Sequence, residues 1–240
     1  GGSSRGVMMT GVSRLESSGE YPQIPGPAGQ RRTLCPGGEE VSVGQRCFHN
    51  AYTLGIDGKY RFLGGDYSLG GQLVGSLIEG GPDREQRDGN LIRSGDVSPG
   101  GKLQLKKEGG GHIRLGATYL ALGKTLDFND LGYMQRQNYQ SADAFVEYDT
   151  NGPFSQFNDG FLGMYGWDNE TLDFLNNGRG VGVFAGVQLK NTWRFFTEIN
   201  ARADYQDDRE VEDGASLERA GGVELNLGID TDGRKPVSAG

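Results

Sequence analysis

The sequence predicts an all-β fold, namely an antiparallel, up-and-down transmembrane β-barrel or a contiguous part of one. Three observations favour this class. Apolar and polar residues alternate along most of the chain, long and short connections follow one another in turn, and aromatic residues gather near the ends of the alternating segments. The composition agrees, because 43 of the 240 residues are glycine, a residue that suits strands which bend or pack closely.

The alternation defines about ten strands and no convincing helix. The expected strands cover residues 8–14, 52–62, 67–77, 102–107, 113–121, 142–148, 161–167, 181–189, 193–202 and 223–229. One alternative stays open at Asp57-Gly58, a pair that is typical of hairpin turns and would split the second strand.

The connections between these strands alternate in length. Those expected to be long cover residues 15–48, 79–100, 123–138, 168–179 and 204–216, and those expected to be short cover 63–66, 108–111, 150–157 and 190–191. A bacterial barrel has short turns on its periplasmic side and longer loops outside. A soluble sandwich has Greek-key crossovers and no reason for such sorting. Residues 1–240 are therefore expected to form one β-barrel domain.

Residue type also differs between the two faces of the expected strands. The lipid-facing set is Leu, Val, Ile, Ala and Gly, with interfacial aromatics at Tyr52, Tyr60, Phe62, Tyr67, Tyr119, Tyr148, Trp167 and Trp193. The other face carries Asp57, Lys59, Arg61, Lys102, Lys106, Arg114, Asp143, Glu147, Arg194, Glu198, Arg202 and Glu224. The alternative is a soluble β-sandwich interaction module whose polar face meets water.

Charge and hydropathy exclude several classes of protein. The net charge of −8, without a basic patch that contains interleaved aromatics, argues against a nucleic-acid partner. No apolar run is long enough for a transmembrane helix, whereas a membrane strand needs only about 9–11 residues. The beginning of the chain lacks the features of a signal peptide, so an exported protein is expected to have further residues upstream.

One segment resembles a known family. Residues 126–136 read LDFNDLGYMQR, which is similar to a signature loop of large bacterial outer-membrane barrels of unknown function. Residues 6–10 (GVMMT) and 231–237 (TDGRKPV) also resemble positions within that barrel. Longer members carry an N-terminal domain similar to carbohydrate-binding module family 9, which this chain lacks. The resemblance implies an outer-membrane location in bacteria and a chain that is a partial barrel.

The signature residues are Asp127, Asn129, Asp130, Gly132, Tyr133 and Arg136. The segment between Asp127 and Arg136 is too apolar for a free loop, because it also contains Phe128 and Met134. We expect it to fold back into the barrel mouth or to pack on a neighbour, with Asp130 and Arg136 forming a pair. We expect the main role of this segment to be structural, with gating as the alternative.

Few residues point to chemistry. Cys35 and Cys47 are the only cysteines, and they predict either a disulfide in an oxidising compartment or two unpaired thiols. The two histidines, His49 and His112, lie in no motif. No catalytic, cofactor-binding or metal-binding residue is therefore assigned, and an outer-membrane hydrolase remains a minor alternative.

Together these observations predict an outer-membrane protein with a channel, transport or assembly role, in contact with outer-membrane lipid. One alternative is the barrel of a surface carbohydrate-binding or carbohydrate-processing protein, which would meet carbohydrate through a missing domain. The soluble β-sandwich module is the other. Because an open barrel would leave unpaired strand edges in lipid, the chain is expected to be an internal or truncated piece.

Overall fold

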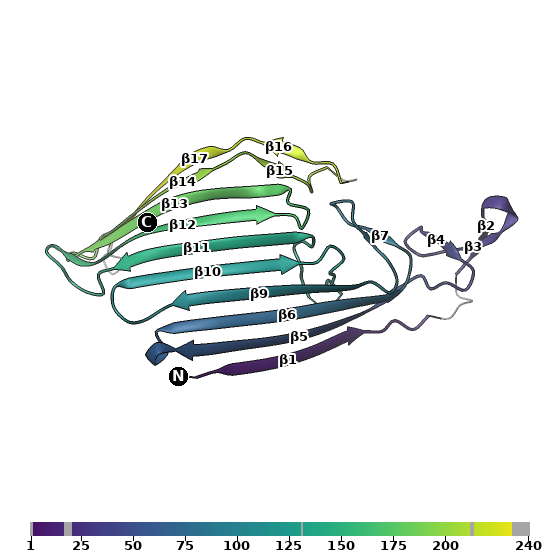
Figure 1. Cartoon of the computed structure of the whole chain (residues 1–240). Helices are drawn as coiled ribbons and strands as arrows, with labels where there is room; N and C mark the ends of the chain where they lie inside the picture. Colours follow the sequence, from purple (N-terminus) through teal and green to yellow (C-terminus); the bar gives the residue numbers. More distant parts are fainter. Residues whose placement is uncertain (1, 17–20, 131, 212–213, 232–240) are drawn as a thin grey trace.

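The computed structural model describes residues 2–16, 21–130, 132–211 and 214–231, and its main feature is one ten-stranded antiparallel sheet (Figure 1). Its strands lie side by side in chain order, as in an up-and-down meander. They are β1 (Ser4–Val12), β5 (His49–Phe62), β6 (Tyr67–Gly80), β9 (Val97–Lys107), β10 (Ile113–Leu122), β11 (Tyr139–Asp149), β12 (Phe157–Glu170), β13 (Asn176–Leu189), β14 (Arg194–Arg202) and β17 (Gly222–Asp230).

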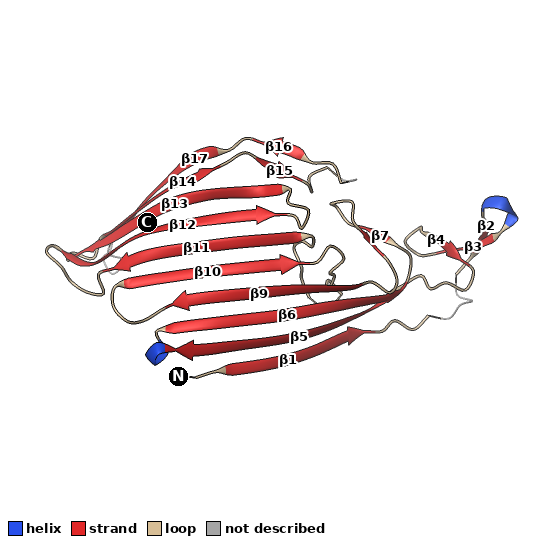
Figure 2. Cartoon of the chain, in the orientation of Figure 1, coloured by secondary structure: helices blue, strands red, loops and turns tan. Residues whose placement is uncertain are grey.

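Small elements occupy the longer connections, which gather at one end of the sheet, opposite the short turns (Figure 2). They are β2 (Gln23–Pro25), β3 (Arg31–Leu34) and β4 (Glu40–Ser42), the hairpin of β7 (Arg84–Glu85) and β8 (Leu91–Ile92), and the hairpin of β15 (Tyr205–Asp207) and β16 (Leu217–Arg219). Two 3-10 turns, η1 (Pro27–Gly29) and η2 (Leu63–Gly65), complete the described elements. Neither helical turn is long and apolar enough to cross a membrane.

The first long connection is tied by a disulfide between Cys35 and Cys47. Both cysteines are buried with Val41, and Tyr21 packs against this group. The small sheet β2-β3-β4 is therefore organised around its own cluster and does not depend on the main sheet for a core.

The expected all-β, antiparallel, up-and-down arrangement is confirmed, and each expected strand forms. The alternative turn at Asp57-Gly58 does not occur, because β5 pairs with β6 without interruption from His49 to Phe62. The described strands form an open sheet whose edges are β1 and β17, so no closed barrel is present among them. Most of the segment 231–237 that resembles the family lies outside the described residues.

The long connection expected at 168–179 is wrong. Strands β12 and β13 continue through this region and leave only residues 171–175 as a loop, which is shorter than the turn at 150–156. Polar residues that suggested a loop instead pair across the strands. Asp168 lies opposite Arg179, with their Oδ1 and Nε atoms 3.6 Å apart. The alternation of long and short connections therefore fails at this point.

Register divides the sheet into an apolar face and a polar face, since directly paired residues project to the same side. The pairs Val7–Ile56 and Ile56–Leu73 belong to the apolar face. The pairs Asp57–Gln72 and Gln72–Lys102 belong to the polar face. All the charged residues that the alternation placed together share this polar face.

Trp167 is an exception to the expected pattern. It pairs with Asp143 and Gly180, so it belongs to the polar face and not to the lipid-facing aromatics. The sequence could not decide this, because both faces of β12 are apolar in composition, with Tyr165 and Trp167 alternating with Leu162 and Met164.

On the polar face of β10 to β13, aromatic rings lie over glycines of neighbouring strands. The ring of Phe184 covers Gly163, that of Tyr165 covers Gly182, and that of Phe161 covers Gly186, each so closely that a Cβ would meet the ring. Phe145 over Gly116 and Trp167 over Gly180 repeat the arrangement. The missing side chains make room for rings that lie flat on the sheet, as in the aromatic covering of glycine known from β design.

This packing predicts that a side chain added at one of the covered glycines destabilises the sheet, whereas one added at an uncovered glycine does not. Gly163→Ala should destabilise the sheet by about 1–3 kcal/mol, because its Cβ displaces the Phe184 ring. Gly71→Ala is the matched control, since nothing lies within 4 Å of a Cβ at Gly71 and its φ is not positive. Thermal unfolding followed by β-sheet circular dichroism measures both. An equal loss in both variants would contradict the ring contact.

Candidate functional site

Residues 123–130 and 132–138, which we call the folded-in segment, lie against the polar face of the sheet. Leu126 is fully buried and packs on Gly100 of β9. The Asp127 amide donates a hydrogen bond of 3.0 Å to Oγ of Ser76 on β6. The expectation that this segment folds back is met in this form, with Leu126 and Met134 buried.

The centre of the segment is tied to the beginning of β5. Arg14 Nη2 donates to Asp130 Oδ1 over 2.6 Å, and His49 Nε2 hydrogen-bonds Asp130 Oδ2. Burial alone would raise the pKa of Asp130, but the hydrogen bonds and charges of Arg14 and His49 outweigh it and hold that pKa below its ordinary value of 3.8.

Two further ion pairs connect the segment to other long connections. Arg84 Nη2 lies 2.9 Å from Oδ2 of the buried Asp127, and Arg136 Nη2 lies 2.9 Å from Oδ2 of the buried Asp208. Arg84 belongs to β7, and Asp208 follows β15. The folded-in segment therefore links the connection between β6 and β9 to the connection between β14 and β17. Arg209 adds a hydrogen bond to the Gln135 carbonyl.

The expected pair between Asp130 and Arg136 is therefore wrong. Each of the two residues is bound instead to a partner from a different loop, which sequence spacing within the segment could not reveal. Asn129 and Asp127 stabilise the segment locally, since the Asn129 amide donates to Asp127 Oδ1 over 3.0 Å and Asn129 Oδ1 accepts from the Met134 amide over 2.9 Å. Gly132 and Tyr133 are exposed and border the cavity described next.

A cavity of about 470 Å³, which we call the inner cavity, lies between the folded-in segment and the polar face. Its apolar walls include Met8, Val74, Leu120, Leu122 and Phe128. Its polar lining includes Thr10, Thr53, Gln72 and Lys102. A second hollow of about 470 Å³ shares Leu122 and Phe128 but is lined on its polar side by Arg136, Asn177 and Arg209.

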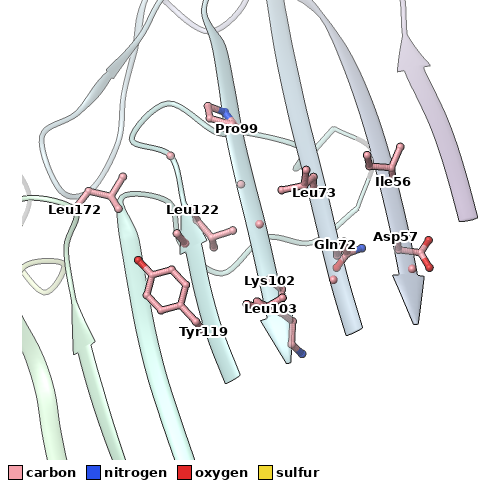
Figure 3. Close-up of a pocket in the computed structure, with 16 residues that line it drawn as sticks. Ile56, Asp57, Gln72, Leu73, Pro99, Lys102, Leu103, Tyr119, Leu122 and Leu172 are labelled. Carbon is pink, nitrogen blue, oxygen red and sulfur yellow. The ribbon is translucent and has the colours of Figure 1, made fainter. Parts of the chain in front are cut away.

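The apolar face carries a separate hollow of about 690 Å³, shown in Figure 3. Ile56, Leu73, Leu103 and Tyr119 border it. Glycines on β5, β6 and β9 also line it, and because they have no side chains the surface is hollowed there. It is a surface depression without a convergent set of charged groups.

The histidines do not assemble a catalytic site in the described part of the chain. His49 bonds to Asp130, but no described hydroxyl or thiol is bonded to its ring. His112 stacks on Tyr148, and its Nδ1 bonds the Asp149 carbonyl. Among the described residues, no group of three or more His, Cys, Asp or Glu side chains could hold a metal ion.

The segment and the strands that carry it fall within a recognised domain. The family described as Domain of unknown function (DUF5916) matches residues 91–240, from β8 to the end of the chain. The chain belongs to this family. No curated protein and no solved structure gives a significant match. The expected domain of unknown function is thus confirmed for the DUF5916 chain, whereas the barrel and the carbohydrate-binding association expected with it stay proposals.

The ionic ties predict a pH-sensitive segment. Because the pKa of Asp130 is lowered by folding, its contribution to stability is present above the unfolded value of 3.8 and is lost as the pH falls through the lower folded value. Asp130→Asn removes the charge that faces Arg14 and His49. Amide exchange across the folded-in segment should then accelerate at neutral pH, because the free energy needed to open the segment falls by about 1–3 kcal/mol.

The matched control is Asp173→Asn. Asp173 pairs with Lys124 of the same segment, but this pair is exposed, with side-chain accessibilities of 63% and 43%. Its loss should change segment opening by at most about 0.5 kcal/mol. Comparable acceleration in both variants would show that the buried contacts of Asp130 do not hold the segment.

Proposed function

We propose that this chain is a stretch of an outer-membrane β-barrel wall with a channel, transport or assembly role. The observation that carries the proposal is the apolar face, which is uncovered across the ten-stranded sheet. Val7 on one edge strand is 77% exposed, Leu162 near the middle 57%, and Leu227 on the other edge strand 73%. At about 4.8 Å per strand, this face is roughly 48 Å wide.

An apolar face of this size must be shielded from water by other apolar groups. Soluble monomers rarely expose contiguous apolar patches larger than a few hundred Å². In the described part of the chain, no second sheet packs on the apolar face, as a β-sandwich would require. Lipid is the cover that matches an antiparallel sheet with one apolar face and one charged face. The soluble interaction module is the weaker interpretation for this reason.

The aromatic side chains support a membrane boundary. Tyr60, Phe62 and Tyr67 lie together near the short turn between β5 and β6, with stacked rings 6.0 and 5.5 Å apart. Trp193 and Phe195 lie at the corresponding turn before β14. Rings at the ends of apolar strands are typical of the girdles of membrane barrels.

The proposal also requires that the two edge strands of the sheet pair with further strands. β1 and β17 each pair with one strand only among the described residues. Unpaired backbone groups in lipid cost several kcal/mol each, so both edges must be completed by further strands or by a second copy. The carbohydrate-processing alternative depends on a domain outside this chain, and no described contact favours it.

Membrane facing predicts an asymmetric response to arginine. Leu115→Arg and Ala185→Arg on the apolar face should hinder insertion, at a cost of roughly 2–4 kcal/mol near the bilayer midplane. Thr118→Arg and Gln188→Arg on the polar face should be tolerated. Insertion is measured by heat-modifiable gel mobility after folding into lipid vesicles. Equal tolerance of all the variants would rule out the membrane assignment.

Export predicts the redox state of the cysteine pair. If the connection that contains Cys35 and Cys47 lies outside the cell, maleimide should label neither cysteine in intact cells unless a reductant is added. A Cys35→Ser variant, which leaves Cys47 unpaired, gives the positive control for labelling. Efficient labelling of both cysteines of the unchanged chain without reductant would show that the bridge is absent.

A further inference from the structure

The inner cavity has an apolar middle and two unlike polar ends. Gln72 and Lys102 form one end, and Thr10 and Thr53 form the other. Both ends are positioned by β6, because Gln72 pairs with Lys102 and Ser76 pairs with Thr53. Gln72 and Ser76 lie roughly 13 Å apart at the rise of an extended strand, so the two polar ends are well separated along β6.

The first end of the inner cavity contains the cation of Lys102, which no described carboxylate neutralises. Lys102 forms no ion pair with any described residue, and the same holds for Lys59, Arg61 and Lys106 on the same face. On the polar face of β5, β6 and β9, the one carboxylate is Asp57. That carboxylate lies over Gly6 of the edge strand β1, on the side away from β9 (Figure 3 shows Asp57 and Lys102 on their separate strands).

Charge therefore favours an anion at this end. The whole chain has a net charge of −8, yet this part of the polar face carries four cations against one carboxylate. Lys102 and Gln72 are both exposed, so an anion that enters the cavity from solvent can reach them. A carboxylate there would accept from Lys102 Nζ and from the Gln72 amide.

The second end contains a polar atom without a partner. Thr53 is 7% exposed, and its Oγ1 has no hydrogen-bond partner in the described structure. Its paired neighbour Ser76 makes no hydrogen bond to it, and the Ser76 hydroxyl accepts instead from the Asp127 amide. A buried hydroxyl without a hydrogen-bond partner is unfavourable. A polar group of a bound molecule would remove this cost.

We propose that the inner cavity binds an amphipathic organic acid, namely a medium-chain carboxylate with a hydroxyl group at its far end. The carboxylate meets Lys102 and Gln72, the hydrocarbon chain lies between Val74, Leu122 and Phe128, and the hydroxyl meets Thr53. A chain of roughly ten carbons spans the distance between the ends. The volume of about 470 Å³ is within the usual range for small-molecule sites.

The proposal deepens the transport role given above, by naming its substrate class, and rests on that role for the passage of the ligand. Binding itself does not require a conducting barrel. A chain that fails to enter lipid but binds the acid would overturn the transport role and keep the site. A chain that inserts but does not bind would do the reverse.

The test is equilibrium dialysis of radiolabelled 10-hydroxydecanoate against the full chain in nonionic detergent. Identical micelles in both compartments cancel the partition of the probe into detergent. We expect excess probe on the protein side, and Lys102→Gln should weaken binding about tenfold or more, since a charge-assisted contact is lost. Lys107→Gln is the control, because Lys107 lies on the other face and bonds the carbonyls of Gly110 and Ile113.

Competitors test the two ends separately. Decylamine should not displace the probe, because its cation would face Lys102, and acetate should compete only weakly, because it lacks the chain. Either molecule competing as well as unlabelled 10-hydroxydecanoate would overturn the proposal. Absence of excess probe with the unchanged chain, or equal binding by Lys102→Gln, would overturn it as well.

Thr53→Val provides a variant that keeps the shape of the side chain. It should weaken 10-hydroxydecanoate about three- to tenfold and leave decanoate unchanged, while thermal stability stays equal or rises because an unpaired hydroxyl is removed. A purely structural Thr53 would change the affinity for both acids equally or for neither, and that result would remove the hydroxyl contact from the proposal.

Discussion

The continuous antiparallel ladder from β1 to β17 is the constraint on which the rest of the molecule depends. Each strand pairs with its neighbour in the chain, so the register of one pair determines the face of every residue in the next. The interruptions lie between β12 and β13, near their ends, at Phe157/Asp159 and Asn169/Glu170. A slip of one residue elsewhere would move Lys102 and Gln72 to the apolar face.

The polar face is covered differently in its two halves. Between β10 and β13, rings such as Phe184 lie flat over glycines and fill the surface. Between β5 and β10, the folded-in segment provides the apolar cover, with Leu126 buried against Gly100. The inner cavity lies in the second half, where a segment that packs on its own supports leaves space beneath it. The rings of the first half pack directly on the backbone.

Ion pairs define the position of the folded-in segment over the sheet, in addition to its apolar packing. Its partners Arg14, Arg84 and Asp208 belong to connections that follow different strands. Partly buried pairs of this kind add little net stability over apolar contacts, but loss of one partner leaves a charge without compensation, at about 3–5 kcal/mol for fully buried pairs. The segment thus has one favoured position over the sheet, and the shape of the inner cavity follows from it.

The sequence by itself determined the main strands, their antiparallel order and most of the residues on each face, because a period of two is a local property of the backbone. It failed where local signals were balanced, since Trp167 lies in a strand that is apolar on both faces and the polar residues around Asp168 suggested a loop. Only the tertiary structure decided the partners of Asp130 and Arg136, because these contacts join residues from different loops. It also decided the environment of Lys102 and Thr53, which no sequence motif distinguishes. The burial of Thr53 and its lack of a partner arise when distant strands and the folded-in segment meet, and no local pattern encodes that meeting.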